Sequence, residues 1–165
     1  MPVDVEKILD QLEIPFRSED FTSLEKRLNL RSGDGIVGMA FSKGNDLGIL
    51  YSKELDDDAK NYVLAHELAH CVLHMEPNSR FHVELKMNCD LYSEEQDESK
   101  PEEQRIKQDV KKEVEADEFA AALLLPKDFQ CADDEIPRRA RELGVSEEIV
   151  RFKLRRLYTT AGKGA

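Results

Sequence analysis

Two histidines four residues apart, with a glutamate beside the first, are the part of this sequence best suited to chemistry. The motif His66-Glu67-Leu68-Ala69-His70 lies in a segment from Ala59 to Met75 that contains neither glycine nor proline, which favours a helix. Residues four apart on a helix share one face with a rise of about 6 Å, so both imidazoles can reach one cation. Glu67 lies about 100° around the helix from His66, which suits a position beside a metal-bound water better than ligation.

The chemistry that this pattern predicts is zinc-dependent hydrolysis of a peptide bond. A catalytic zinc site has three protein ligands and leaves the fourth position to water. Zinc lowers the pKa of that water and polarises the peptide carbonyl, while Glu67 takes the proton and later delivers it to the leaving amine. The motif supplies only two ligands, so a third is expected on another element. Taken alone, the motif also fits a pair of hydrogen-bonded core histidines.

The third ligand is expected on a second helical segment, Arg105 to Leu125, which ends at a proline. Its candidate carboxylates are Glu113, Glu115, Asp117 and Glu118. Glu113 and Asp117 are four residues apart and share a face with two alanines that let another helix approach closely. Glu115 points about 200° away from Glu113 and is expected to face solvent. We predict Glu113 as the ligand, with Asp117 accepting a hydrogen bond from the second nitrogen of a histidine.

Other reactive side chains near the motif are expected to have supporting roles. His74 continues the ligand face by one turn, but a fourth protein ligand would close the site to substrate, so packing or support of a ligand is favoured. Cys71 points off that face and is predicted to be a buried, inert thiol. Three residues that follow the helix could stabilise the oxyanion, although surface or packing roles are favoured for each: Arg80, His82 and Tyr92.

The two motifs together resemble the ImmA/IrrE family of metallo-endopeptidases. The second runs Glu113-Val-Glu-Ala-Asp-Glu-Phe-Ala-Ala-Ala-Leu-Leu-Leu-Pro126 and is similar to the family pattern Glu-x-x-Ala-Asn/Asp-x-Phe-Ala-Ala-x-Leu-Leu-Met-Pro. The first glutamate of that pattern, which aligns with Glu113, is the third zinc ligand in the family. Leu125 replaces the usual methionine, and the stretch between His70 and Glu113 is longer than expected. The resemblance implies that the substrate is a helix-turn-helix repressor.

The elements that must position these residues indicate an α+β fold. Apolar residues at helical spacing predict amphipathic helices around Val5–Leu12 and Leu24–Leu30. Two short apolar runs around a turn-rich loop predict a β-hairpin over residues 35–51. We therefore expect a zincin-like metallopeptidase domain, in which a small antiparallel sheet packs on the active-site helix and further helices follow at the C-terminus.

The chain is assigned to a zinc metallopeptidase domain, residues 1–130, and a basic helical segment packed on it, residues 131–165. Within the first, residues 93–104 contain no apolar side chain and are predicted to be an inserted acidic loop. Residues 137–165 carry eight Lys or Arg and three Glu, a balance of +5. The helical segments around Gly144 resemble a helix-turn-helix. The alternative function is therefore a DNA-binding or zinc-holding regulator that does not hydrolyse peptides.

Composition narrows the classes of partner. The net charge is −11, and 36% of residues are charged, which disfavours nucleic acid and anionic membranes. No stretch approaches the roughly eighteen apolar residues of a membrane span, and no signal peptide is recognised. Cys71, Cys89 and Cys131 lack metal-ligand spacing and are expected to be free thiols in a reducing cytoplasm. We expect a cytoplasmic enzyme with a protein substrate.

Overall fold

The structure is a computed structural model that describes residues 3–27, 29, 35–43, 46–75, 84–85, 92–93, 102–145 and 147–161. In chain order its elements are α1 (Val5–Gln11), β1 (Phe16–Glu19), α2 (Thr22–Arg27), β2 (Gly38–Lys43), β3 (Asp46–Ser52), α3 (Asp57–Ala69), the π-helical turn η1 (His70–His74), β4 (Glu84–Leu85), β5 (Tyr92–Ser93), α4 (Glu102–Leu124), the 3₁₀ turn η2 (Asp133–Glu135), α5 (Ile136–Leu143) and α6 (Glu147–Ala161).

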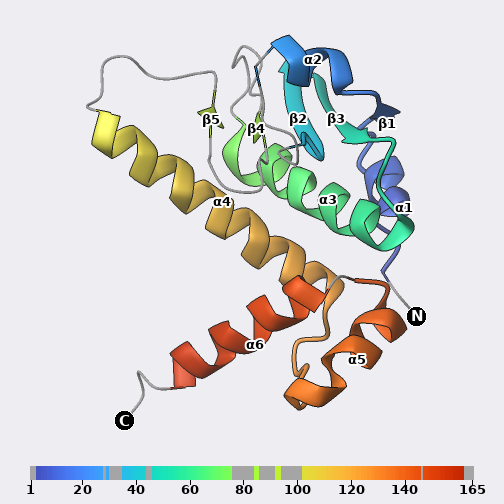
Figure 1. The fold of residues 1–165 in the computed structure, drawn as a ribbon, viewed down its shortest axis with the longest axis vertical. Coiled ribbons are helices and arrows are strands. Elements are labelled where there is room, and N and C mark those ends of the chain that lie inside the picture. The colour runs from blue at the N-terminus through green and yellow to red at the C-terminus, as the bar shows by residue number, and fades with distance from the viewer. Residues whose placement is uncertain are drawn as a thin grey trace.

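Helix α3 lies at the centre of the fold. One side of it contacts the strands β2 and β3, and other sides contact α1 and the long helix α4. Helix α4 crosses the molecule and separates α3 from α5 and α6, as Figure 1 shows. One cluster of buried side chains joins these layers, from Val5 in α1 through Leu64 in α3 to Leu154 in α6. The fold is thus mixed α+β, and the predicted histidine motif occupies its middle layer.

The main sheet has three strands in the order β1-β3-β2. Strands β2 and β3 form the predicted antiparallel hairpin, with Ala40 opposite Ile49. Strand β1 instead runs parallel to β3, with Phe16 opposite Ile49. The sheet is therefore mixed, and the prediction of a purely antiparallel sheet was wrong. The connection from β1 through α2 carries the chain to the far side of β3, so β1 is not part of the hairpin and pairs with the other edge of β3.

Helix α3 begins earlier than predicted and ends in a distorted turn. The Asp56 side chain caps it by accepting from the Ala59 backbone N–H at 2.8 Å, as expected for a carboxylate at a helix N-terminus. From His70 the helix continues as the π-helical turn, which the Met75 N–H closes by donating to the His70 carbonyl at 3.1 Å. The predicted helix from 59 to 75 is confirmed in outline, but its last turn is wound more loosely.

The acidic segment before α4 is only partly the loop that composition predicts. Ser93 belongs to β5, which pairs with β4, and α4 begins at Glu102. Residues 102–104 are therefore helical, and residues 94–101 lie outside the described part of the chain. The positive end of the helix dipole explains the correction, because carboxylates in the first turn of a helix are stabilised there.

Candidate metal centre

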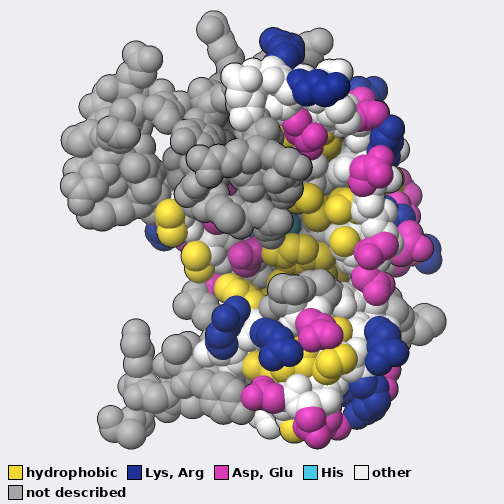
Figure 2. Space-filling view, viewed as in Figure 1, with side chains coloured by type: hydrophobic (Ala, Val, Ile, Leu, Met, Phe, Trp, Pro, Cys, Tyr) yellow, Lys and Arg dark blue, Asp and Glu magenta, His cyan; other side chains and the backbone are white. Residues whose placement is uncertain are grey.

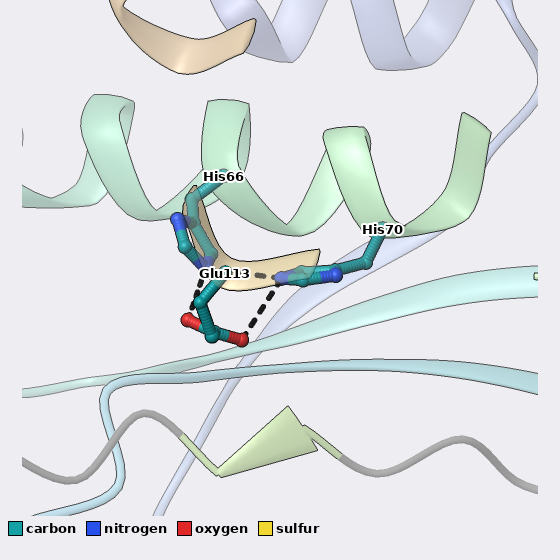
Figure 3. A group of neighbouring side chains, drawn as sticks. All are labelled: His66, His70 and Glu113. Carbon is teal, nitrogen blue, oxygen red and sulfur yellow. Dashed lines mark hydrogen bonds and ion pairs between the residues drawn. The ribbon is translucent and has the colours of Figure 1, made fainter. Parts of the chain in front are cut away.

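The side chains of His66, His70 and Glu113 converge between α3 and α4. The Nε2 atoms of His66 and His70 lie 3.0 Å apart. One oxygen of the Glu113 carboxylate lies 3.2 Å from Nε2 of His66, and its other oxygen lies 3.4 Å from Nε2 of His70. Figure 3 shows both rings projecting from the same side of α3, with the carboxylate reaching them from α4. The helical spacing in the sequence and the packing of the two helices thus bring the three predicted residues together.

The cluster is almost fully removed from water. His66 is 2% exposed and His70 0% exposed, while Glu113 keeps a little more contact with solvent. Burial would raise the pKa of the Glu113 carboxyl, but the contacts with His66 and His70 outweigh burial and hold the pKa well below its ordinary value. Glu113 therefore stays ionised and presents a negative charge to the two rings.

The three residues fit a divalent cation in type, burial and spacing. Within the described residues they form a group of possible metal ligands whose donor atoms all lie within 4.8 Å of one another. Zinc bonded tetrahedrally at about 2.0–2.1 Å would place ligand atoms about 3.3 Å apart, close to the 3.0, 3.2 and 3.4 Å between the atoms named above. Two imidazole nitrogens and a carboxylate are also a usual ligand set of catalytic zinc.

His66 is oriented by a carboxylate and a tyrosine. Its Nδ1 lies 2.9 Å from Oδ1 of Asp117, which agrees with the prediction that Asp117 accepts a hydrogen bond from a histidine of the motif. The Tyr62 hydroxyl donates to the same oxygen through a short hydrogen bond. Burial and the charge of Asp117 raise the pKa of Tyr62, so its hydroxyl keeps the proton that it donates. Sequence reasoning missed Tyr62, although its position four residues before His66 on the same helical face was an available signal.

His70 has a different support. Its Nδ1 lies 2.8 Å from Nδ1 of His74, and Nε2 of His74 lies 3.1 Å from Oε2 of Glu115. His74 therefore lies behind His70 and outside the convergent group, in agreement with the predicted packing or supporting role. Glu115 stays out of the ligand cluster as predicted. It is not simply exposed to solvent, however, because its Oε2 contacts Nε2 of His74.

Glu67 lies on the sheet side of α3 and is 1% exposed. A Cβ atom added to Gly38, the first residue of β2, would lie 2.6 Å from Oε1 of Glu67 and 2.5 Å from Cγ1 of Val63. The backbone of β2 thus passes directly against the Glu67 side chain. Only glycine leaves room for this approach. Sequence reasoning missed Gly38, and no sequence signal distinguishes it from the other glycines near the hairpin.

The remaining candidates divide into one confirmed residue and three that the structure does not describe fully. Cys71 is buried, as predicted, and burial raises the pKa of its thiol to about 12, which disfavours the reactive thiolate. Arg80 and His82 lie outside the described residues. Of Tyr92 only the backbone, in β5, is described. An oxyanion role for these three residues remains untested.

A comparison with known protein families shows which family the chain belongs to. A family model described as the IrrE N-terminal-like domain, a peptidase family, matches residues 38–155. The chain belongs to the ImmA/IrrE metallopeptidase family. No curated relative matches it. The matched range of this ImmA/IrrE protein contains the three clustered residues, Glu67 and Gly38, and it extends into α6.

The C-terminal helices of this ImmA/IrrE protein carry basic side chains that are paired with nearby carboxylates. Arg138 contacts Glu135 at 2.7 Å and Glu142 at 2.8 Å, and Arg139 contacts Glu142 at 2.9 Å. In the view of Figure 2, basic and acidic side chains both lie around a hydrophobic area where Figure 1 draws α5 and the start of α6. Among the described helices, none has an apolar stretch long enough to span a membrane.

Proposed function

We propose that this protein is a zinc-dependent endopeptidase in which His66, His70 and Glu113 hold the metal and Glu67 is the general base. The observation that carries the proposal is the convergence of two buried Nε2 atoms and an ionised carboxylate within 3.0–3.4 Å of one another. Zinc is chosen over other metals because two imidazoles and one carboxylate are the protein ligands of many of its catalytic sites.

The proposed reaction is the hydrolysis of a peptide bond by a water molecule. When bound, zinc would lower the pKa of the attacking water and polarise the carbonyl of the scissile peptide. Glu67 would accept a proton from the attacking water as the water oxygen adds to the carbonyl carbon, and it would return the proton to the nitrogen as the C–N bond breaks. His66 and His70 are held by hydrogen bonds to Asp117 and His74, so they keep their orientation throughout. The thiol of Cys71 is too weakly acidic to serve as a nucleophile.

The proposed substrate is a helix-turn-helix transcriptional repressor. This part of the proposal is supported by the family affiliation, since characterised members of the family cleave such repressors. A zincin-like arrangement, the division of the chain near residue 130 and a cytoplasmic location remain predictions that accompany it. They are supported respectively by the histidine motif on a central helix, the basic composition of the last residues, and the free thiols of Cys71 and Cys131.

The alternative of a DNA-binding regulator has less support. It would use α5 and α6, which meet at Gly144 in a left-handed conformation with φ 63°. The arginines Arg138, Arg139 and Arg151 are engaged by glutamates three or four residues away, and such pairing reduces the charge available to phosphates. No described contact favours this reading over the peptidase.

Metal content tests the first part of the proposal. Zinc per chain is measured by elemental mass spectrometry in the wild type, Glu113→Gln and Glu118→Gln, all purified identically without chelators. Glu118 is an exposed glutamate on the same helix and provides a matched control. We expect about one zinc per chain in the wild type and Glu118→Gln but much less in Glu113→Gln. A wild type that takes up no zinc, even after zinc is added back, would refute the proposal.

Cleavage tests the second part. The zinc-loaded protein is incubated with helix-turn-helix repressors encoded beside its gene, and the products are identified by intact mass. Discrete fragments that require both zinc and Glu67 would support a site-specific endopeptidase. A zinc-holding regulator would instead retain its biological effect in Glu67→Gln and lose it in Glu113→Gln.

A further inference from the structure

The two histidines of the cluster are supported at their distal nitrogens by different means. Nδ1 of His66 meets the carboxylate of Asp117 directly, at 2.9 Å. Nδ1 of His70 meets another imidazole, that of His74, at 2.8 Å. His74 in turn contacts a carboxylate, because Oε2 of Glu115 lies 3.1 Å from Nε2 of His74. Both supports thus end on α4, but the second passes through an additional ring.

The positions of the protons follow from the acceptor at the end of this chain. Glu115 can only accept when it is ionised, so Nε2 of His74 carries a hydrogen and donates it. In a neutral His74 the other nitrogen, Nδ1, is then an acceptor, and it receives the N–H of His70 Nδ1. Nε2 of His70 is left with a lone pair directed at the cluster. This set of tautomers satisfies both hydrogen bonds of His74 described above, and in it His70 can bind a metal.

The π-helical turn at the end of α3 makes the contact between His70 and His74 possible. In the π-helical turn His70–His74 the hydrogen bonds span one residue more than in an α-helix, so successive side chains rotate by fewer degrees. His74 therefore lies behind the ring of His70. Its side chain is 5% exposed, whereas that of Glu115 is 39% exposed. The second oxygen of Glu115 lies 3.5 Å from Nζ of Lys111, so the chain of contacts leads from the buried cluster to the surface.

We propose that His74 and Glu115 are positioning residues that hold His70 in its metal-binding tautomer and orientation, as Asp117 does for His66. This inference rests on the proposed zinc site. His74 is not assigned as a metal ligand. Its Nδ1 contacts Nδ1 of His70, and that nitrogen of His70 points away from the cluster, whereas Nε2 of His70 points into it. Groups of this kind, which support a metal-bound histidine, typically change metal affinity by about 10–100-fold when removed.

Zinc affinity, measured by competition with a chromogenic zinc chelator of known affinity, tests the inference in the intact protein. We expect His74→Ala to bind zinc about 10–100-fold more weakly than the wild type while still reaching about one zinc per chain at saturation. Glu115→Ala should weaken binding in the same direction, whereas Glu115→Gln, which keeps an acceptor oxygen, should lose less. Glu118→Ala is the matched control and should remain within about twofold of the wild type.

The double variant shows whether the two residues act in series. If Glu115 acts only through His74, His74→Ala combined with Glu115→Ala should bind zinc within about twofold of His74→Ala alone. If the two substitutions lower zinc affinity independently, so that their fold-changes multiply, Glu115 does not act through His74 and the inference is overturned. An affinity of His74→Ala within about twofold of the wild type, while Glu113→Gln still loses zinc, would also overturn it and leave the zinc site standing. A wild type that binds no zinc would remove both proposals.

The tautomers give a readout that does not depend on any variant folding correctly. Long-range ¹H–¹⁵N correlation spectra of the zinc-loaded wild type should show His70 protonated at Nδ1 and His74 protonated at Nε2 alone. A proton on Nδ1 of His74 would overturn the inference, because that nitrogen could not then accept from His70.

Discussion

The helix pairs α3–α4 and α5–α6 both carry many ionisable side chains but hold them differently. Between α3 and α4, His66 and Asp117 are 51 residues apart in the chain, and His74 and Glu115 are 41 residues apart. In α5 and α6, Arg138, Arg139 and Arg151 contact glutamates three or four residues away in or beside the same helix. The first group is largely buried and the second lies on the surface.

The difference separates ionisable groups that are buried between two helices from charged pairs on the surface of a single helix. Exposed pairs at helical spacing form as soon as the helix does, and they contribute little because water screens them. Ionisable groups brought together in the interior lose their hydration and are retained only where every one has a partner. The concentration of such groups between α3 and α4 is the reason why we propose the active site there, and five predictions test this contrast.

The largest effect is expected at Glu67. Glu67→Gln keeps the shape of the side chain but removes the proposed base, so we expect kcat for peptide cleavage to fall by roughly 10²–10⁴-fold. Zinc content should not change, because Glu67 is not in the ligand cluster. Cleavage of the proposed repressor substrate by the purified variant, followed by intact mass, measures the effect. A variant as fast as the wild type would mean that another group is the base.

Gly38→Ala should displace the Glu67 side chain, because Gly38 in β2 packs directly against it. The new methyl group would press on Glu67 and Val63, and misplacement of a reacting group by about 1 Å can lower the rate by about a hundredfold. Gly35→Ala is the matched control, since its Cβ would meet only Oε1 of Glu25 at an ordinary 3.4 Å. We expect reduced kcat with unchanged zinc for the first substitution and near wild-type kcat for the second. Equal rates would show that β2 can move aside.

Removal of zinc should destabilise the helix pair α3–α4 and leave the pair α5–α6 nearly unchanged. Binding to the folded state alone stabilises it by about 2.7 kcal/mol when free zinc is 100 times its Kd. Hydrogen exchange of the zinc-loaded and chelator-treated protein should therefore show faster exchange in α3 and α4 after zinc removal, with little change in α5. Uniform acceleration throughout the chain would indicate that the two pairs unfold as a single unit.

The surface pairs should give a small effect that depends on pH. Hydrogen bonds from Arg139 and then Arg138 lower the pKa of Glu142 below its ordinary value of 4.5. A carboxyl with a lowered pKa in the folded state stabilises the fold above the ordinary pKa, and this stabilisation disappears as the pH falls through the lowered value. Glu142→Gln should therefore unfold at slightly lower urea than the wild type near neutral pH but not in acid. A difference that grows in acid would contradict this assignment.

The smallest effect is expected for the arginines of α5. Replacement of Arg138 and Arg139 together by glutamine should leave zinc content and peptide cleavage unchanged. Binding to duplex DNA at about 150 mM salt, measured by fluorescence anisotropy, should be weak in both proteins. Tight binding by the wild type that the double variant loses would favour the DNA-binding alternative.

Much of the site could be predicted because its signals are local. The spacing of His66 and His70 determines that they share a helical face, and the same periodicity separates Glu113 from Glu115 on α4. Strand β1 could not be predicted in this way. It has only four residues, and its two middle residues are exposed while its ends are half-buried, so it lacks the alternation that marks a strand.

The sequence by itself determined which side chains could bind zinc and which faces they occupy, because helical periodicity depends only on neighbouring residues. Only the tertiary structure decided which carboxylate meets which imidazole. Asp117 reaches His66 directly, Glu115 reaches His70 through His74, and Gly38 admits the close approach of β2 to Glu67. These choices depend on how α4 and the sheet pack on α3, and such contacts join residues far apart in the chain, where local spacing carries no information.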